Sequence, residues 1–175
     1  MIFTITPGYY LVALNALTGD PVPTFGAGGF LDLQRGLRLG PGRTDMDIGI
    51  SFPPLVVGDV VIAGAAHEVG MRPLSENNVK GDIRGFDART GEQRWQWDPI
   101  PRDKNRARYQ EWLPDQVAKT GAANAWAPLA ADLARDLLFI PTGSASPDFY
   151  GGERLGANRW ANSLVVLAAG TGGDA

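Results

Sequence analysis

A tryptophan among small residues is the first feature of this sequence that could serve a chemical role. Trp126 lies in the segment 121–128, which reads GAANAWAP. An indole with small neighbours can present an open flat face, and a planar ring can stack on such a face. The alternative is a core tryptophan that packs between two sheets. The spacing of the residues leaves both interpretations open.

A polar loop follows an apolar stretch near the end of the chain. Residues 141–152 read PTGSASPDFYGG, so the hydroxyls of Thr142, Ser144 and Ser146 and the carboxylate of Asp148 lie just past a predicted strand. Such oxygens suit a hard cation like calcium or the acid groups of a ligand. The loop lacks the Gly-x-Ser-x-Gly pattern of a nucleophile elbow. An ordinary hydrogen-bonded loop is the alternative interpretation.

Two further segments are weaker candidates for a metal site. Glu68 could provide an oxygen ligand, and His67 beside it could act as a base. Asp45 and Asp47 resemble the start of a calcium loop, but the distal glutamate of such a loop is missing at the proper spacing. A solvated loop is the simpler interpretation of both segments.

Composition excludes several classes of protein. The 175 residues carry a net charge of −3, no cysteine and one histidine, so we expect no disulfide and no thiolate or multi-histidine metal site. The charges of both signs are mixed, which argues against a nucleic-acid partner. The longest apolar run is too short to span a bilayer, and the first residues do not resemble a signal peptide. Both ends resemble cuts through a larger repeat protein.

The elements that would position these residues are short strands, and one hairpin is especially clear. Ile83–Phe86 and Arg94–Trp97 are rich in β-branched and aromatic residues, which favours strands. Between them, Asp87 can accept backbone N–H groups through its carboxylate, and Gly91 can take the positive φ of a tight turn. Trp95 is large enough to wedge between two neighbouring sheets.

The same frame of apolar strand, polar link and Thr-Gly pair occurs three times. The pairs begin at Thr18, Thr90 and Thr171, which are 72 and 81 residues apart, and Phe25 follows the first pair where Trp95 follows the second. These separations exceed the roughly 40–50 residues of one propeller blade. We therefore expect a single partial β-propeller domain over residues 1–175, with inserted loops near 26–49, 66–80, 98–120 and 143–160.

The remaining apolar runs predict an all-β chain. Residues 98–120 are expected to form a charged loop or a partly helical insert, and no segment has a strong helical periodicity. Gly58 and Asp59 predict a turn between two apolar strands. Besides the central hairpin, we expect hairpins at 2–6 with 10–15, 54–57 with 60–63, and 123–130 with 137–141, and a last strand at 161–169.

Several of these motifs, in this order, resemble the pyrroloquinoline-quinone (PQQ) dependent dehydrogenases, in particular the membrane-bound glucose/quinate/shikimate type. The segments that carry the resemblance are 81–95, 124–128, 141–152 and 158–164. It implies about two to three four-stranded blades of an eight-bladed propeller, with PQQ and a calcium or magnesium ion on its axis. It also implies that an alcohol group of a sugar or polyol is oxidised, with hydride passing to the quinone.

The resemblance also assigns residues to the cofactor. Trp126 matches the tryptophan whose indole lies beneath the PQQ ring. Ser51 falls where related enzymes place a hydroxyl that forms a hydrogen bond with the cofactor. Thr142 is assigned to the same cofactor site. For the metal, Glu68 falls near a calcium-ligating glutamate, and Ser144 stands where relatives have a calcium-binding asparagine. The catalytic aspartate of the family lies downstream of these motifs, so no catalytic residue is assigned.

Two functions from different classes follow from the sequence. The first is a fragment of a PQQ-dependent dehydrogenase, inactive alone, whose complete form passes electrons to ubiquinone at the periplasmic face of the inner membrane. The second is a non-enzymatic β-propeller scaffold of the outer-membrane-assembly type. A small β-domain that uses the repeat only for packing is a third interpretation. The loops at 124–128 and 146–152 argue against it, because packing alone does not require them.

Overall fold

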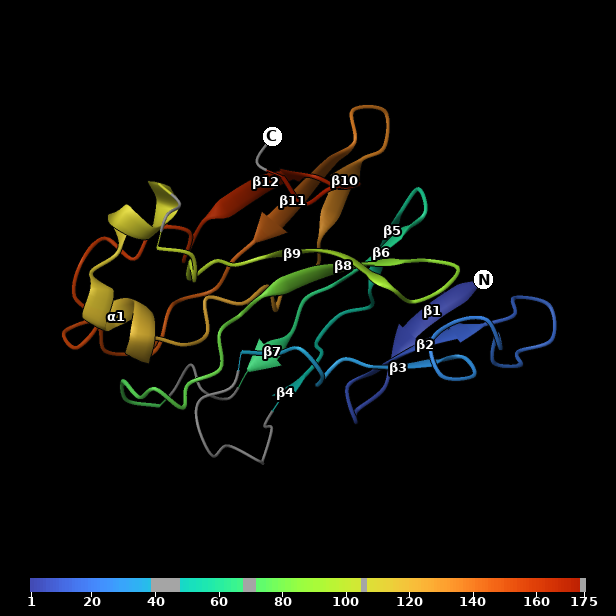
Figure 1. Ribbon diagram of the computed structural model, residues 1–175, viewed down its shortest axis with the longest axis horizontal. Coiled ribbons are helices and arrows are strands. Elements are labelled where there is room, and N and C mark those ends of the chain that lie inside the picture. Colours follow the sequence, from blue (N-terminus) through green and yellow to red (C-terminus); the bar gives the residue numbers. More distant parts are fainter. Residues whose placement is uncertain (39–47, 68–71, 105–106, 174–175) are drawn as a thin grey trace.

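A computed structural model shows a chain built mainly of short antiparallel strands, and it describes residues 1–38, 48–67, 72–104 and 107–173. Three sheets follow one another along the molecule (Figure 1). The first contains β1 (Ile2–Ile5), β2 (Tyr10–Leu14) and β3 (Phe30–Asp32). The middle sheet contains β5 (Leu55–Val57), β6 (Val60–Ala63), β8 (Ile83–Asp87) and β9 (Gln93–Trp97). The third contains β10 (Ala130–Asp132), β11 (Leu137–Pro141) and β12 (Leu164–Ala168).

Smaller elements lie in the connections. A two-stranded pair joins β4 (Ile48–Gly49) to β7 (Ala66–His67). The insert after β9 holds a 3₁₀ helix (Ala107–Glu111) and α1 (Pro114–Lys119), so it takes the partly helical form, one of the two that were expected. Within the part of the chain that the structure describes, no helix is both long and apolar enough to cross a membrane.

The three Thr-Gly pairs form the same turn in each sheet. The turn follows β2, β8 and β12, and in each case the glycine N–H donates to the carbonyl of the residue three positions before the threonine. The bonds are Gly19 to Asn15 at 2.9 Å, Gly91 to Asp87 at 2.8 Å and Gly172 to Ala168 at 2.7 Å. All three glycines have positive φ angles, of 80°, 78° and 67°, which a residue with a Cβ atom adopts only at a cost.

Aligning the sheets on these turns shows which strands each one holds. The turn follows the second strand of the first sheet, the third strand of the middle sheet and the last strand of the third. The middle sheet is therefore the one complete four-stranded unit among the described residues. The flanking sheets have three strands each among the described residues.

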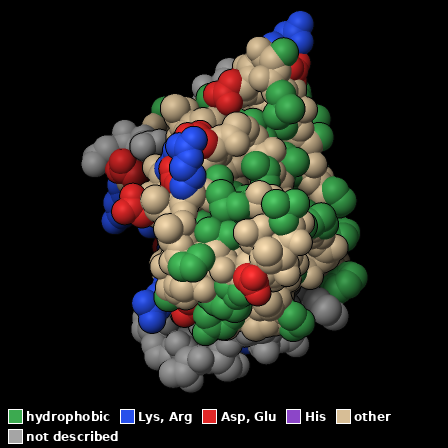
Figure 2. Space-filling model, turned by 90° about the vertical axis from the view of Figure 1, so that its right-hand side faces the viewer, with side chains coloured by type: hydrophobic (Ala, Val, Ile, Leu, Met, Phe, Trp, Pro, Cys, Tyr) green, Lys and Arg blue, Asp and Glu red, His purple; other side chains and the backbone are tan. Residues whose placement is uncertain are grey.

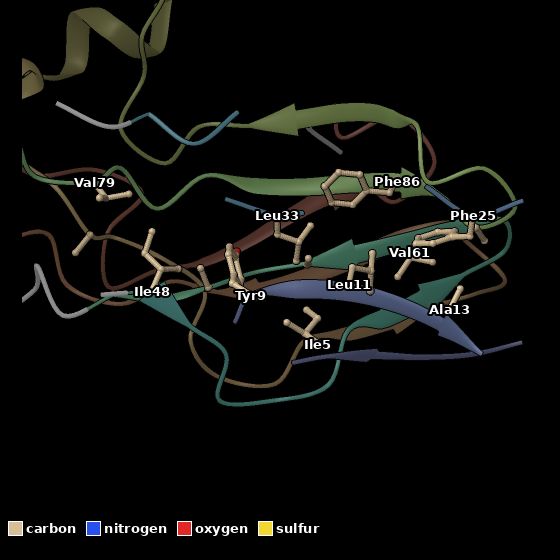
Figure 3. Close-up of a cluster of buried hydrophobic side chains, with 14 residues drawn as sticks. Ile5, Tyr9, Leu11, Ala13, Phe25, Leu33, Ile48, Val61, Val79 and Phe86 are labelled. Carbon is tan, nitrogen blue, oxygen red and sulfur yellow. The ribbon is translucent and has the colours of Figure 1, made fainter. Parts of the chain in front are cut away.

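The middle sheet is buried on both faces. Because side chains alternate along a strand, Val61 and Phe86 face the first sheet, whereas Val60 and Ile62 face the third. Figure 3 shows Leu11 of the first sheet in one cluster with Val61 and Phe86. Strand β6 is buried along its whole length for this reason.

An aromatic residue bridges each pair of neighbouring sheets. Phe25 contacts Gly91 of the middle sheet, and the N–H of Gly26 donates to the carbonyl of Thr90 at 2.8 Å. Trp95 lies against Gly172 of the third sheet, and its indole N–H donates to the carbonyl of Ala169 at 2.9 Å. The prediction that Trp95 wedges between two sheets is confirmed.

The outer face of the first sheet carries exposed hydrophobic side chains. This face carries Ile2, Tyr10 and Phe30. The strand register places them on the side of the sheet opposite to the core residues Leu11 and Ala13. Figure 2 views the molecule from this end and shows hydrophobic side chains spread over the surface. The opposite face of the same sheet provides Leu11 and Ala13 to the core.

Two expectations about strands were wrong in detail. Residues 123–129 do not form a strand, and β11 pairs with the short β10 instead. Ala122 and Ala123 have φ angles of 55° and 56°, outside the extended region that a strand requires. The connection at 26–49 was expected to lack strands, yet β3 lies within it and pairs with β2.

Candidate functional site

A hollow of about 230 Å³ brings together four separate segments of the sequence. Its lining includes Ser51, Trp126 and Ser144, three of the residues predicted to bind the cofactor or metal. Asn124, Gly143 and Asp148 complete its polar and backbone surface, beside Ala66 and Ala122. The hollow therefore collects one flat aromatic face, two hydroxyls, an amide and a carboxylate.

Trp126 presents an open indole to this hollow, with 56% of the residue exposed. On the covered side lies Gly143, where a methyl group would come within 2.7 Å of the indole Nε1. The carbonyl of Trp126 accepts a hydrogen bond from the hydroxyl of Ser51. Backbone contacts thus hold the residue, while much of its ring stays accessible.

The segment that carries Trp126 is fastened on both sides. The side-chain amide of Asn124 donates to the carbonyl of Ala65 at 2.5 Å, and the N–H of Ala65 donates to the carbonyl of Ala125 at 3.1 Å. On the other side, the N–H of Gly143 donates to the carbonyl of Asn124 at 2.9 Å. The backbone that carries the indole is therefore held in place on both sides.

Unfavourable backbone angles gather around the same hollow. Seven described residues other than glycine have positive φ, and five of them lie in the two segments that border the hollow or support it. A left-handed φ costs a residue with a Cβ atom roughly 1–2 kcal/mol. Such strain persists only where the surroundings impose it, and it is common at ligand sites. The five residues are Ala122, Ala123, Asn158, Trp160 and Asn162.

A buried polar network holds Gly121, which precedes the strained pair Ala122 and Ala123. The hydroxyl of Ser146 accepts the N–H of Gly121 at 2.7 Å and the side-chain amide of Asn78 at 3.3 Å. That amide also donates to the carbonyl of Pro73 at 2.8 Å. Asn78 and Ser146 are both buried, so the bonds lie where water does not compete for them.

Thr142 is not among the residues that line the hollow. Its hydroxyl lies 2.5 Å from the carbonyl oxygen of Trp160 and accepts the N–H of Ser163 at 3.1 Å. The assignment of Thr142 to the cofactor site stays a prediction, and the structure places its hydroxyl in these two bonds. Thr142 thereby ties the start of the 142–148 loop to the strained segment around Trp160.

The predicted metal ligands are only partly described. Ser144 lines the hollow, where its hydroxyl accepts the side-chain amide of Asn162 at 3.2 Å. Glu68 lies outside the described residues, as do Asp45 and Asp47. Within the described ranges, no three His, Asp or Glu side chains gather in a way that could hold a metal ion.

Two residues of the site had not been assigned a role from the sequence. Asn124 lies beside Trp126 and carries the amide that anchors the segment, and its polar side chain among alanines was the available signal. The sequence around Gly143 gave no sign of its role. That role is to leave room for the indole of Trp126, which lies close to it only in the folded chain.

Comparison with known proteins identifies the fold family. The model of the β-propeller domain of glucose/ethanol/alcohol dehydrogenases, the PQQ family, matches residues 1–175. The chain belongs to this family of PQQ β-propeller domains. The family resemblance and the β-propeller class expected from the sequence are thereby confirmed.

The relatives are dehydrogenases whose names include several alcohol substrates. Quinoprotein glucose dehydrogenase A of Acinetobacter calcoaceticus is 35% identical over 93% of this chain and 19% of its own length. The glycerol dehydrogenase large subunit of Gluconobacter thailandicus is 34% identical over 89% and 20%. The quinate/shikimate dehydrogenase (quinone) of Acinetobacter baylyi is 30% identical over 98% and 20%. The chain thus spans about a fifth of the length of the curated relatives it matches.

A solved structure agrees with the fold. The quinohemoprotein alcohol dehydrogenase from Comamonas testosteroni superposes with a TM-score of 0.73 over 99% of this chain and 25% of that chain, at 24% identity. At this identity the likeness concerns the fold alone.

Proposed function

We propose that this chain forms the part of a PQQ-dependent dehydrogenase on which the cofactor ring rests. The observation that carries the proposal is the open indole of Trp126, held over Gly143 at the wall of the hollow. A planar tricyclic quinone is the kind of group that stacks on such a face. The family match of the whole chain supports the same assignment.

The residues present fit the ring. Trp126 would support its face, and the polar groups of Ser51, Asn124 and Ser144 line the hollow where its oxygen substituents would need partners. When bound, PQQ would supply the carbonyl chemistry that accepts a hydride from an alcohol. The chain's own part would be to bind and orient the ring, since none of its residues is assigned as the base.

The metal is a separate part of the proposal. Calcium or magnesium would take Ser144 and Glu68 as oxygen ligands, and Asp148 is the carboxylate that lines the hollow among the described residues. Calcium takes six to eight oxygen ligands, so these residues alone do not complete a site. The described part of the hollow therefore fits the ring better than it fits the ion.

The substrate we propose is an alcohol group on a sugar or polyol. The names of the relatives, which include glucose, glycerol and quinate/shikimate, support this class. We extend the proposal to electron transfer to ubiquinone at the periplasmic face of the inner membrane, by family membership alone. Dye-linked oxidation of glucose by this chain with PQQ and calcium should be undetectable. Clear turnover would contradict the view that the chain supplies only part of the site.

Binding of PQQ tests the assignment of Trp126. Equilibrium dialysis of the chain with PQQ should give saturable binding that weakens about tenfold in Trp126→Ala, since base–aromatic stacking interactions of this kind are worth about 1–3 kcal/mol. Phe149→Ala is the matched control, because Phe149 is an exposed aromatic residue that does not line the hollow. It should bind like the unchanged chain. Equal affinities in all three proteins, or no binding at all, would favour the non-enzymatic scaffold.

A further inference from the structure

A second hollow, of about 500 Å³, is lined by basic side chains and lies away from the one beside Trp126. Lys80 and Ala122 are bridge partners in adjacent segments, and Ala122 lines the first hollow whereas Lys80 lines the second. We call this second site the basic hollow. Its charged lining consists of Arg38, Lys80, Arg102, Lys104 and Asp115.

The two arginines of the basic hollow already have acidic partners. Arg38 donates to both carboxylate oxygens of Asp82 through its Nε, at 2.7 and 3.0 Å, and Arg102 reaches the same carboxylate at 3.0 Å. Arg102 also pairs with Asp98 at 2.7 Å. The side chain of Asp82 is fully buried, so these pairs are built into the fold. They leave the arginines with little charge to offer a ligand.

Lys80 is different, because it is buried and its ammonium group bonds a backbone carbonyl rather than a carboxylate. The residue is only 8% exposed, and its ammonium group donates to the carbonyl of Ala118 in the last turn of α1 at 2.8 Å. A lysine ammonium carries three N–H donors, so this bond leaves two. Among the described residues, Lys80 forms no salt bridge with a carboxylate. A buried cation in this state is stabilised by any anion that reaches it.

Lys104 adds a second charge at the rim, for which the described residues offer no salt bridge, and Tyr109 and Val117 add apolar surface. Against these two lysines stands the single carboxylate of Asp115 in the lining. We propose that the basic hollow binds a small organic anion, whose carboxylate or phosphate group meets Lys80 and Lys104 while its apolar body lies against Tyr109 and Val117. This site is independent of the proposed PQQ platform.

Calorimetric titration with two probes, benzoate and inorganic phosphate, tests this site at constant ionic strength set with sodium chloride. We expect saturable binding of at least one probe, weakened about tenfold in Lys80→Met and in Lys104→Met, because each loses a charge-assisted hydrogen bond. Binding of benzoate alone would identify an organic carboxylate, and binding of phosphate a phosphate group. Lys104 is exposed, so its variant should fold even where Lys80→Met does not.

Lys119→Met is the control, because it removes the same charge from an exposed position of α1 outside the hollow. It should change the affinity by less than twofold. If neither probe binds saturably, or if Lys119→Met weakens binding as much as the other two variants, the site is overturned.

The pH dependence gives an independent readout. The pKa of Lys80 is lowered to about 8, mainly by burial and next by the charge of Arg38. The charges of Asp82 and Glu76 act in the opposite direction and offset part of this shift. Arg102, Lys104, Tyr109 and Asp115 are the other titratable groups of the lining. An anion stabilises the charged ammonium, so binding should be stronger at pH 7 than at pH 9 in the unchanged chain. If the affinity of Lys80→Met depended on pH in the same way as that of the unchanged chain, the role of Lys80 would be contradicted.

Discussion

Trp95 and Trp126 both lie across a glycine, but their surroundings differ on the second face of the ring. Gly85 contacts Trp95 on one side and Gly172 lies on the other, where a methyl group would come within 2.6 Å of the indole. Trp95 is accordingly only 7% exposed. Trp126 has Gly143 beside it and faces the hollow, and it is 56% exposed.

The difference separates a structural tryptophan from one that is available to a ligand. A glycine lets an indole approach the backbone closely, because there is no Cβ atom in the way. Trp95 uses both faces to join two sheets, and its N–H is satisfied by the carbonyl of Ala169. Trp126 is held by its backbone and by one edge of the ring, so a flat ligand can complete the same kind of stack.

The largest expected effect comes from truncating the two rings. Trp95→Ala should lower the free energy of unfolding by about 3–5 kcal/mol, because it removes a large side chain from a packed core. Trp126→Ala should cost about 1 kcal/mol or less, as an exposed position does. Urea unfolding of both variants measures the difference. Similar losses in the two variants would break the comparison.

A smaller effect should come from adding a methyl group under each ring. Gly85→Ala places a Cβ atom against the buried indole of Trp95 and should cost about 1–3 kcal/mol by overpacking. Gly143→Ala displaces an exposed ring, which can move, so stability should change little. The affinity of the Gly143→Ala variant for PQQ should nevertheless fall. Unfolding and dialysis experiments on the same preparations would show whether the two losses separate in this way.

Trp95→Phe sharpens the comparison by removing only the N–H and part of the ring. The change makes the second junction resemble the first, where Phe25 contacts Gly91. We expect a loss of about 1–2 kcal/mol, since the carbonyl of Ala169 loses its donor. Thermal unfolding measures this loss. A cost as large as that of Trp95→Ala would mean that the hydrogen bond, rather than the packing, holds the sheets together.

The smallest effect concerns the turn that precedes Trp95. Hydrogen bonds from Arg94, and then from the N–H groups of Arg89 and Thr90, hold the pKa of Asp87 well below its ordinary value. Asp87 therefore contributes stability above the unfolded-state pKa of about 4, and this stability is lost as the pH falls toward the folded-state value. Asp87→Ala should flatten the stability profile below about pH 4. An unchanged profile would contradict the role of these bonds.

The sequence was informative where a residue acts through its local surroundings. The Thr-Gly turns and the hairpins at 55–63 and 83–97 were predictable, because turn residues and apolar alternation determine them locally. The absence of a strand at 123–129 was not, since Ala122 and Ala123 are held in left-handed conformations by backbone hydrogen bonds to the distant Val79 and Ser144. The hydrogen bonds of Thr142 were not predictable for the same reason, because its partners lie some twenty residues away.

The central claim is that the exposed face of Trp126 receives the planar cofactor. Fluorine NMR of the chain labelled with 5-fluorotryptophan should resolve its five tryptophans, and Trp126→Phe would assign the resonance of that residue. On addition of PQQ, the Trp126 resonance should shift strongly, while that of the buried Trp95 stays unchanged. A titration in which the Trp126 resonance does not move, or in which another tryptophan responds instead, would contradict the account.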